Sequence, residues 1–191
     1  MKVMVIADKE SKILTEYYSE NNLENIEFIL SVGDLPYSYL ETIKTNLKRP
    51  LLYVKGNHDT YKTNLFDREF IEWKSVEISG IRIIGIGCQN RKGQILSEEK
   101  MRKKLKRLYQ RNKQKTGVDI IISHYPAFGM GDGQDTVHRG YQAIRDFVEK
   151  MQPTYFVYGH NHLNYGRKLR IIESNKTKYV NAYEKAIIEI K

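Results

Sequence analysis

Polar motifs rich in histidine and acid follow five strand-like apolar runs of the sequence. Two of these runs end in an aspartate, Asp8 and Asp34. The other three lead into motifs that hold four of the five histidines: Gly56-Asn57-His58-Asp59, Ser123-His124-Tyr125-Pro126 and Gly159-His160-Asn161-His162. Carboxylates and imidazoles together are ligands for divalent manganese, iron or zinc. The pattern therefore predicts a metal centre built from loops at one edge of a sheet.

The order of the acids suggests how two cations would share this centre. Two cations about 3.5–4 Å apart need a common anionic ligand, and Asp34, the middle acid, is the candidate bridge. Asp8 and Glu10 are two positions apart, so they face the same way in an extended segment and would bind the first metal together. His160 and His162 have the same spacing, and they can project from one loop to different metals.

Alternating strands and helices would position the first three motifs. We expect strands at Val3–Ala7, Ile26–Val32 and Pro50–Val54, with helices at Ser11–Asn22 and Tyr37–Leu47 between them. Such βαβ units imply parallel strands. Each motif then lies at the C-terminal end of its strand, where open α/β sheets place their ligands.

The second half of the chain continues this pattern. We expect a hairpin of Val76–Ser79 and Ile81–Gly87 around Gly80, strands at Val118–Ser123 and Tyr155–Tyr158, a helix at Tyr141–Met151, and closing strands, antiparallel in arrangement, at Lys178–Ala182 and Ala186–Ile190. A further helix should begin after Ser97, which can cap it, and it carries an apolar stripe of Met101, Leu105 and Leu108. The sequence has no internal repeat or linker, so we expect residues 1–191 to form one domain.

The ordered motifs resemble those of the calcineurin-like metallophosphoesterase superfamily. That family's pattern is Asp-x-His, Gly-Asp, Gly-Asn-His-Asp/Glu, a lone His and Gly-His-x-His, and the match runs from Asp8 to His162. The stretch from His124 to His162 is also similar to small bacterial single-domain phosphoesterases. The resemblance implies an α/β fold, a four-layer α/β/β/α sandwich of two mixed β-sheets flanked by helices, with the metals at one edge.

The resemblance also implies a role for each site residue. One metal would take Asp8, Glu10, Asp34 and His162, and the other would take Asp34, Asn57, His124 and His160. A hydroxide bridging the two metals would attack the phosphorus of a phosphodiester or phosphomonoester. His58 would protonate the leaving oxygen or stabilise the transition state, with Asp59 orienting its ring.

Glu10 departs from the family pattern, which usually has histidine at this position. A carboxylate can still ligate a metal, and it would raise the first metal's carboxylates to Asp8, Glu10 and Asp34. Harder ligands favour manganese or magnesium over zinc. We therefore expect two divalent ions, manganese first, with magnesium, iron and zinc as alternatives.

His138 and Arg139 lie between two ligand motifs, just before a predicted helix. Arg139 could bind a substrate phosphate through two hydrogen bonds. It could equally be a helix-start residue paired with a surface acid, and the sequence leaves both interpretations open. The expected substrate is a small phosphoester or a nucleotide. Trp73 is expected to be a core anchor.

The net charge of +9, from 32 basic and 23 acidic residues, attracts anions. A nucleic-acid partner is one interpretation. An ordinary soluble protein from a lysine-rich proteome is favoured instead, because much of the excess positive charge lies in Lys100–Lys115, which resembles a solvated helix face. A nuclease therefore remains an alternative function. A catalytically weak or inactive binding scaffold is another: Glu10 favours it, whereas the presence of both His58 and Asp59 argues against it.

Bulk properties indicate an ordinary globular protein. The 191 residues are 40% hydrophobic and 29% charged, and no apolar run is long enough to cross a bilayer. The run from Met1 to Ala7 is too short for a signal-peptide core. Cys88 is the only cysteine, so no internal disulfide is expected. We expect a cytoplasmic protein without a membrane partner, and the sequence leaves its oligomeric state open.

Overall fold

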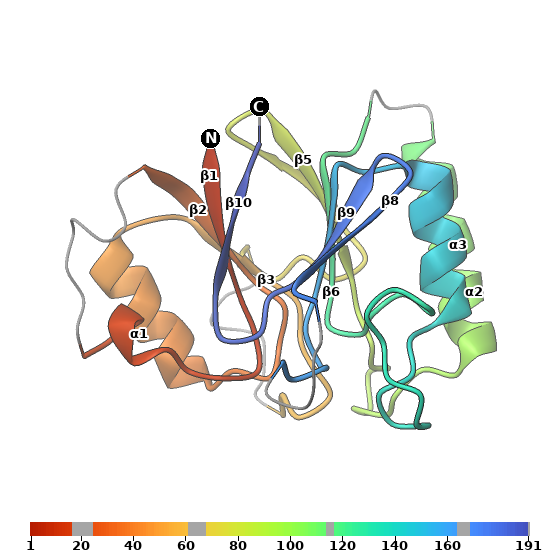
Figure 1. Ribbon diagram of the computed structural model, residues 1–191, viewed down its shortest axis with the longest axis horizontal. Helices are drawn as coiled ribbons and strands as arrows, with labels where there is room; N and C mark the ends of the chain where they lie inside the picture. The colour runs from red at the N-terminus through yellow and green to blue at the C-terminus, as the bar shows by residue number, and fades with distance from the viewer. Residues whose placement is uncertain (17–24, 61–67, 114–116, 164–168, 191) are drawn as a thin grey trace.

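Two mixed β-sheets lie face to face in the computed structural model, which describes residues 1–16, 25–60, 68–113, 117–163 and 169–190 (Figure 1). The first sheet has the order β10-β1-β2-β3, formed by Ala186–Glu189, Lys2–Ile6, Ile26–Ser31 and Leu51–Tyr53. The second has the order β4-β5-β6-β7-β9-β8, formed by Ser75–Ile78, Ile81–Ile86, Ile120–Ser123, Tyr155–Tyr158, Thr177–Asn181 and Ile171–Ser174.

Strand pairing confirms the parallel arrangement that the βαβ pattern predicts. β1 pairs in parallel with β2, and β2 with β3. In the second sheet β5, β6, β7 and β9 are parallel neighbours. The expected hairpin of β4 and β5 is also present, as an antiparallel pair at the sheet edge. Parallel strands bring their C-terminal ends, and the motifs that follow them, to one edge.

Three helices cover the outer faces of the sheets among the described residues. α1 (Tyr37–Leu47) packs on the first sheet, whereas α2 (Glu98–Asn112) and α3 (Gln142–Met151) pack on the second, so the layers run α/β/β/α (Figure 1). This arrangement confirms the predicted four-layer sandwich. No described helix is both long and apolar enough to cross a membrane.

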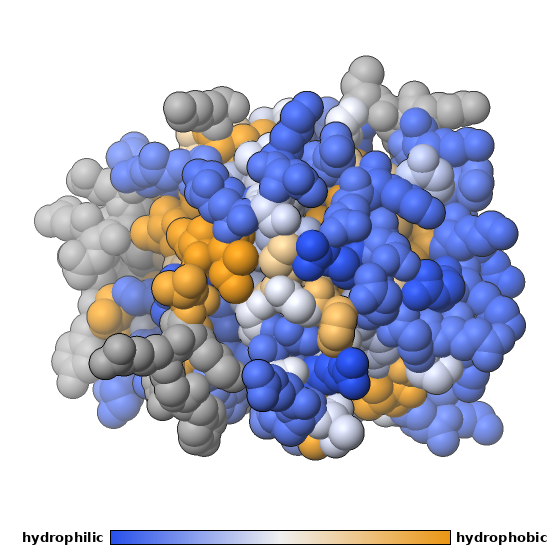
Figure 2. Space-filling model, turned by 45° about the vertical axis from the view of Figure 1, so that its right-hand side comes forward, coloured by the Kyte–Doolittle hydropathy of each residue, from blue (hydrophilic) through white to orange (hydrophobic). Residues whose placement is uncertain are grey.

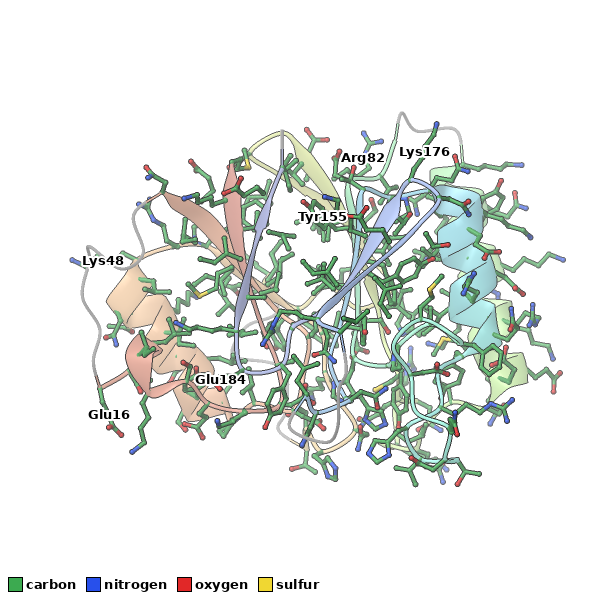
Figure 3. All side chains as sticks on the ribbon, in the orientation of Figure 1. Glu16, Lys48, Arg82, Tyr155, Lys176 and Glu184 are labelled. Atoms are coloured by element: carbon green, nitrogen blue, oxygen red, sulfur yellow. The ribbon has the colours of Figure 1, made fainter. Side chains whose placement is uncertain are left out.

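Alternation along β1 shows how the sequence creates two cores. Val3 and Val5 face the second sheet, while Met4 and Ile6 face α1, and each of the four is at most 1% exposed. Successive strand residues point to opposite faces, so a strand covered on both sides is apolar throughout. Figure 3 shows side chains filling the space between the sheets.

α2 begins and buries its face as its sequence predicts. The Ser97 hydroxyl accepts a hydrogen bond from the backbone N–H of Lys100 at 3.4 Å, and the predicted stripe of Met101, Leu105 and Leu108 is buried. The rest of the helix surface carries charged side chains. Figure 2 shows a largely hydrophilic surface on the side of the molecule where α2 and α3 lie.

The structure differs from the expected elements in two places, and it contains one strand that was not predicted. The predicted Ser11–Asn22 helix is present only as a short 3-10 helix, η1 (Lys12–Leu14), and residues 17–22 lie outside the described residues. The closing strands do not pair with each other, because β9 lies in the second sheet and β10 lies in the first. β8 was not predicted: it is a half-exposed edge strand that pairs only with β9, so it lacks the apolar pattern of a buried strand.

Candidate metal centre

Asp8, Asp34 and His124 converge where the two sheets meet. They follow β1, β2 and β6, and one ligand atom of each lies within 4.8 Å of the others. No other group of three such residues is found in the described part of the chain. The loops after these strands gather at the lower edge of the sandwich in Figure 1. The structure thus brings together ligands that are 116 positions apart at their extremes, from Asp8 to His124.

Three of the predicted ligands have left-handed backbone conformations. The φ angles are 64° at Asp8, 56° at Asp34 and 66° at His160. This conformation costs roughly 1–2 kcal/mol for a residue other than glycine. Strained backbone of this kind gathers at functional sites, where the surrounding structure holds it in place. The chain therefore turns sharply at three of the predicted ligands, after β1, β2 and β7.

Motif glycines allow the loops to approach so closely. A Cβ atom at Gly56 would lie 2.1 Å from Oδ1 of Asp34, and one at Gly159 would lie 2.7 Å from Oδ2 of Asp8. Real Cβ contacts are essentially never so short, so any larger residue would push a carboxylate away. The glycines of these two motifs are therefore required by the carboxylates of neighbouring loops.

Asp34 lies at the centre of the hydrogen-bond network. Its Oδ1 accepts a hydrogen bond from the backbone N–H of His58 at 2.8 Å, and its Oδ2 lies 3.3 Å from Nε2 of His124. Burial alone would raise the pKa of this carboxyl, but the hydrogen bond and charge of His124 hold it below its usual value. Asp34 is thus kept ionised, as a bridging ligand must be.

The His124 ring shows whether a cation fits this cluster. The ring is fully buried, and Nδ1 lies 2.9 Å from the carbonyl oxygen of Val32, so Nδ1 must carry a proton and donate it. Nε2 then faces two acceptors, Oδ1 of Asn57 at 2.9 Å and Oδ2 of Asp34 at 3.3 Å. Burial alone would lower the pKa of the ring, but Asp34 raises it above its usual value.

A metal ion suits this arrangement better than a proton does. One nitrogen and two oxygens converge, and all three can offer lone pairs to a cation. A histidine that binds a metal usually donates its other N–H to a carbonyl or carboxylate, as His124 does to Val32. The residues present therefore fit a divalent metal.

His160 has the complementary arrangement. Its Nε2 lies 2.8 Å from the carbonyl oxygen of Val137 and so carries the ring proton, which leaves the lone pair on Nδ1. Burial lowers the pKa of this ring to about 4, so the ring is neutral at physiological pH. A neutral imidazole with one nitrogen fixed by a carbonyl is a suitable metal ligand. Its ring centroid is 5.1 Å from that of His124.

Asp8 is held by the His160 loop and is costly to ionise. Both of its carboxylate oxygens accept a hydrogen bond from the backbone N–H of His160, at 2.9 and 3.1 Å. Burial nevertheless raises the pKa of Asp8 from 3.8 to about 6. A bound cation would offset this cost by pairing with the charge.

This cost predicts that Asp8→Asn stabilises the metal-free protein above pH 6. As pH rises from 4 to 6, the Asp8 carboxyl ionises in the unfolded state before it ionises in the folded state. The free energy of unfolding therefore falls over this range, and the full loss is present above pH 6. At pH 8 the variant should gain roughly 1–3 kcal/mol in free energy of unfolding, and at pH 4 almost nothing. Urea unfolding in a chelator at both pH values measures the difference.

A matched substitution on the surface should act in the opposite direction. Hydrogen bonds from Gln142 and Arg102 lower the pKa of Asp146, so Asp146→Asn should lower stability at pH 8. An Asp8→Asn variant that is less stable than the parent at pH 8 would contradict the assigned cost of burying this charge.

Asn57, His58 and Asp59 differ in their exposure. Asn57 is half-buried against His124, the His58 side chain is exposed, and Asp59 is only 6% exposed. Oδ2 of Asp59 accepts hydrogen bonds from the backbone N–H groups of Gly56 at 2.8 Å and Asp34 at 2.9 Å. These hydrogen bonds of Asp59 hold the Gly56 and Asp34 loops together. Its orienting role toward the His58 ring stays a prediction.

Glu10 and His162 lie outside the tight group of three within the described residues. Glu10 is exposed, and its neighbours are held by Glu184, whose carboxylate accepts hydrogen bonds from Lys9 Nζ at 3.1 Å and Ser11 Oγ at 3.2 Å. His162 is half-buried with its ring centroid 4.8 Å from that of Tyr183. Their assignment as ligands stays a prediction.

His138 and Arg139 lie at the rim of the centre. The His138 ring is 5.5 Å from that of His160, and its Nδ1 is 2.9 Å from the Asp135 carboxylate. The Arg139 guanidinium lies over the Phe128 ring, 4.9 Å from its centroid, and remains exposed. Only His138 is therefore packed against a candidate ligand, and a phosphate contact by Arg139 stays a prediction.

Two supports of the centre were missed by sequence reasoning. The carbonyl of Val137 fixes His160, and the buried Asn161 donates hydrogen bonds to the carbonyls of Gly131 at 3.0 Å and His138 at 3.3 Å. Asn161 in turn accepts a hydrogen bond at its own carbonyl from Asn181 Nδ2 at 2.7 Å. The only sequence signal was the position of Asn161 between two candidate ligands.

Comparisons with known proteins agree with this architecture. The family described as calcineurin-like phosphoesterase matches residues 1–164, which confirms the resemblance inferred from the motifs. A search of curated proteins found no match.

Solved structures share the fold at low sequence identity. The protein TT1561 of Thermus thermophilus superposes with a TM-score of 0.66 at 11% identity, covering 96% of this chain and 89% of that chain. GAP50, the anchor in the inner membrane complex of Plasmodium, has a TM-score of 0.60 at 16% identity, covering 95% and 70%. At such identities the likeness shows the fold alone.

Proposed function

We propose that this chain, which belongs to the calcineurin-like phosphoesterase family, is a metal-dependent hydrolase of phosphoesters that uses two divalent cations. The observation that carries the proposal is the convergence of Asp8, Asp34 and His124 within 4.8 Å at the C-terminal edge of both sheets. Acid and imidazole ligands at this edge are the donor set that a divalent metal requires.

We assign Asp34 as the ligand shared by both metals, because its two oxygens already face different partners. Asn57, His124 and His160 complete one side, and Asp8, Glu10 and His162 complete the other. When bound, the cations supply a hydroxide at neutral pH and neutralise charge on the phosphoryl oxygens. The carboxylates favour manganese or magnesium over zinc, and manganese is the proposed native metal.

His58 is the proposed proton donor to the leaving oxygen. Its backbone N–H is fixed by Asp34 at 2.8 Å, while its side chain is exposed to an approaching substrate. A phosphodiester that enters from solvent would meet this ring next to the metal ligands. We propose that Asp59 supports His58 indirectly, by holding the backbone of the Gly56 and Asp34 loops.

Metal removal and replacement test the proposal. Protein stripped with a chelator should not hydrolyse bis(p-nitrophenyl) phosphate, and added manganese should restore turnover, with magnesium less effective and zinc least. The same series with p-nitrophenyl phosphate separates diesterase from monoesterase activity. Bound metal without turnover on either ester would refute the hydrolase and favour a binding scaffold of the same fold.

We also propose that residues 1–191 act as one domain in the cytoplasm. The physiological substrate under this proposal is a small phosphoester or nucleotide. Tight binding of DNA that depends steeply on salt would instead favour a nuclease.

A further inference from the structure

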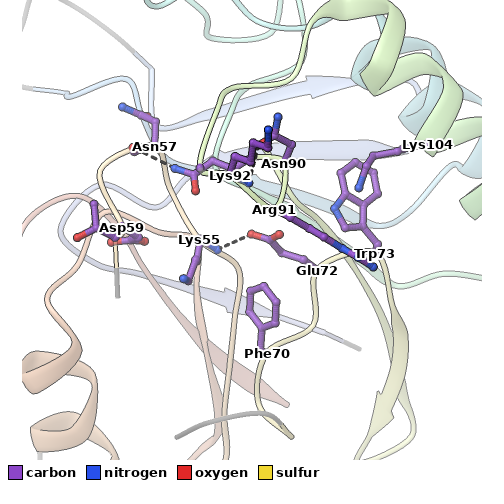
Figure 4. Close-up of a pocket in the computed structure, with 13 residues that line it drawn as sticks. Lys55, Asn57, Asp59, Phe70, Glu72, Trp73, Asn90, Arg91, Lys92 and Lys104 are labelled. Carbon is purple, nitrogen blue, oxygen red and sulfur yellow. Dashed lines mark hydrogen bonds between the residues drawn. The ribbon is translucent and has the colours of Figure 1, made fainter. Parts of the chain in front are cut away.

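A cavity of about 870 Å³ adjoins the candidate metal centre. It shares Asn57 and Asp59 with the centre and extends away from it toward α2 (Figure 4). Lys55 and Thr60 of the same segment also line it, and three further segments supply the rest: Phe70, Glu72 and Trp73 from one, Gln89 to Gly93 from another, and Lys104 from α2. Cavities of roughly 300–1,000 Å³ are the size that binds small organic ligands.

The loop that carries Arg91 and Lys92 is built against the metal-centre loop. Nε2 of Gln89 donates to the carbonyl oxygens of Gly56 and Asn57, both at 3.1 Å. Oδ1 of Asn90 accepts hydrogen bonds from the backbone N–H groups of Lys92 at 2.8 Å and Gln94 at 3.1 Å. These bonds tie the backbone of the loop that carries Arg91 and Lys92, both of which line the cavity, to the Asn57 loop.

The inner wall combines an aromatic ring with opposite charges. Nζ of Lys104 lies 4.2 Å from the centroid of the Trp73 ring, and Oε1 of the Glu72 carboxyl accepts a hydrogen bond from the backbone N–H of Lys55 at 3.0 Å. Burial raises the pKa of Glu72 to about 7. Burial lowers the pKa of Lys104, and the negative charge of Glu72 acts in the opposite direction. Figure 4 shows their side chains around one hollow.

Trp73 is held in a strained position at this wall. Its φ angle is 60°, a genuine outlier for a bulky residue, and it is only partly buried against the core of the second sheet. Trp73 packs against the core, as the sequence predicts, and it also lines the cavity. Backbone strain of this kind persists only where the surrounding structure holds it in place.

We propose that this cavity is a second subsite that binds the nucleotide portion of a substrate, with Arg91 and Lys104 contacting a further phosphate and Trp73 contacting the base. The inference rests on the proposed function, because it places the bond to be cleaved at the neighbouring metal centre. The positively charged side chains of Arg91 and Lys104 favour a ligand with an additional negative charge. An indole ring offers a surface for a planar base. The Glu72 carboxyl is an acceptor for N–H groups at the edge of the base.

A nucleotide fits these features better than a nucleic-acid strand. A strand would need a continuous basic groove of several nucleotides, whereas the basic side chains here line one cavity that also contains the half-buried Glu72 carboxyl. That cavity has room for a base, a sugar and two phosphates, which a single nucleotide supplies.

The only tryptophan of the chain provides a direct binding signal. The full-length protein, in chelator to prevent hydrolysis and again with magnesium, is titrated with adenosine, AMP, ADP and pyrophosphate while Trp73 fluorescence is recorded. ADP should change the fluorescence and bind more tightly than AMP, and adenosine and pyrophosphate should each bind more weakly than ADP. Equilibrium dialysis with ADP checks each dissociation constant independently of fluorescence.

Matched variants assign the signal to the cavity. Arg91→Gln and Lys104→Gln should each raise the Kd for ADP about tenfold, because a hydrogen bond between charged groups is lost. Lys103→Gln removes the same charge from an exposed residue of α2 that pairs with Glu99 outside the cavity, and it should leave this Kd unchanged.

The outcomes separate this inference from the proposed function. An ADP affinity that is the same in Arg91→Gln as in the parent overturns the subsite, even if manganese-dependent turnover of bis(p-nitrophenyl) phosphate is intact. Loss of turnover together with Arg91-dependent ADP binding supports the subsite and removes the hydrolase. A ten-nucleotide oligothymidylate that binds more tightly than ADP and depends on Arg91 overturns the nucleotide in favour of a nucleic-acid track.

Discussion

Asp34→Asn should reduce metal-dependent turnover by about 10³-fold or more and should lower the amount of metal that the protein retains. The substitution removes the charge shared by both proposed metals, and it turns one oxygen of the network into an NH₂ group. That group can no longer act as an acceptor toward Nε2 of His124, which lies 3.3 Å from Oδ2 in the parent. A reduction of this size in turnover corresponds to a loss of several kcal/mol of transition-state stabilisation by the metals.

Metal analysis of the dialysed protein and turnover of bis(p-nitrophenyl) phosphate test the prediction together. Asp146→Asn is the matched control, since it makes the same chemical change on the exposed surface of α3, beside Arg102. Circular dichroism should show both variants folded, because one Asp34 oxygen and its backbone N–H bond to Asp59 survive. Full turnover in Asp34→Asn would refute the bridging assignment.

Short-range patterns were enough to predict the strands that carry Asp8, Asp34 and His124. Apolar runs that end in Asp8, Asp34 or His124 correspond to β1, β2 and β6, because a buried parallel strand must be apolar on both faces. α1 spans Tyr37–Leu47, as expected from its apolar spacing. These features depend on neighbours in sequence, so the sequence alone carries them.

Long-range contacts decide the features that the sequence did not predict. The Val137 carbonyl fixes the His160 tautomer across 23 positions. The role of Gly56 depends on how closely the Asp34 side chain approaches from another loop. The cavity beside Asn57 combines residues from the Glu72, Arg91 and Lys104 segments, none of which has a motif of its own. Chemistry distributed in this way becomes visible only when the loops are placed in space.

Asp59 illustrates the difference between a motif and its mechanism. Its position after His58 suggested that it orients the ring, a role that resembles many acid–histidine pairs. In the structure its buried carboxylate joins two loops through backbone N–H groups. A substitution of Asp59 would therefore disturb the Asp34 ligand as well as His58, so His58 itself is the cleaner target for testing proton transfer.

His58→Ala should lower turnover by about 10²–10⁴-fold while leaving metal content near that of the parent. The contact between this residue and the metal centre is a backbone N–H to Oδ1 of Asp34 at 2.8 Å, and alanine retains it. The exposed imidazole is lost, and with it the proposed proton for the leaving oxygen. His58→Gln, which keeps a hydrogen-bond donor but does not exchange a proton near neutral pH, should restore little of the activity.

The leaving group distinguishes proton donation from simple charge stabilisation by His58. p-Nitrophenolate is a stable anion that needs little protonation as it departs, whereas an alkoxide needs a full proton. The loss in kcat for His58→Ala should therefore be larger for an alkyl phosphodiester than for bis(p-nitrophenyl) phosphate. Equal losses for both esters would show that the ring acts on the phosphoryl charge instead. Loss of bound metal in His58→Ala would place the ring among the ligands, because an exposed proton donor can be removed without disturbing Asp34 and His124.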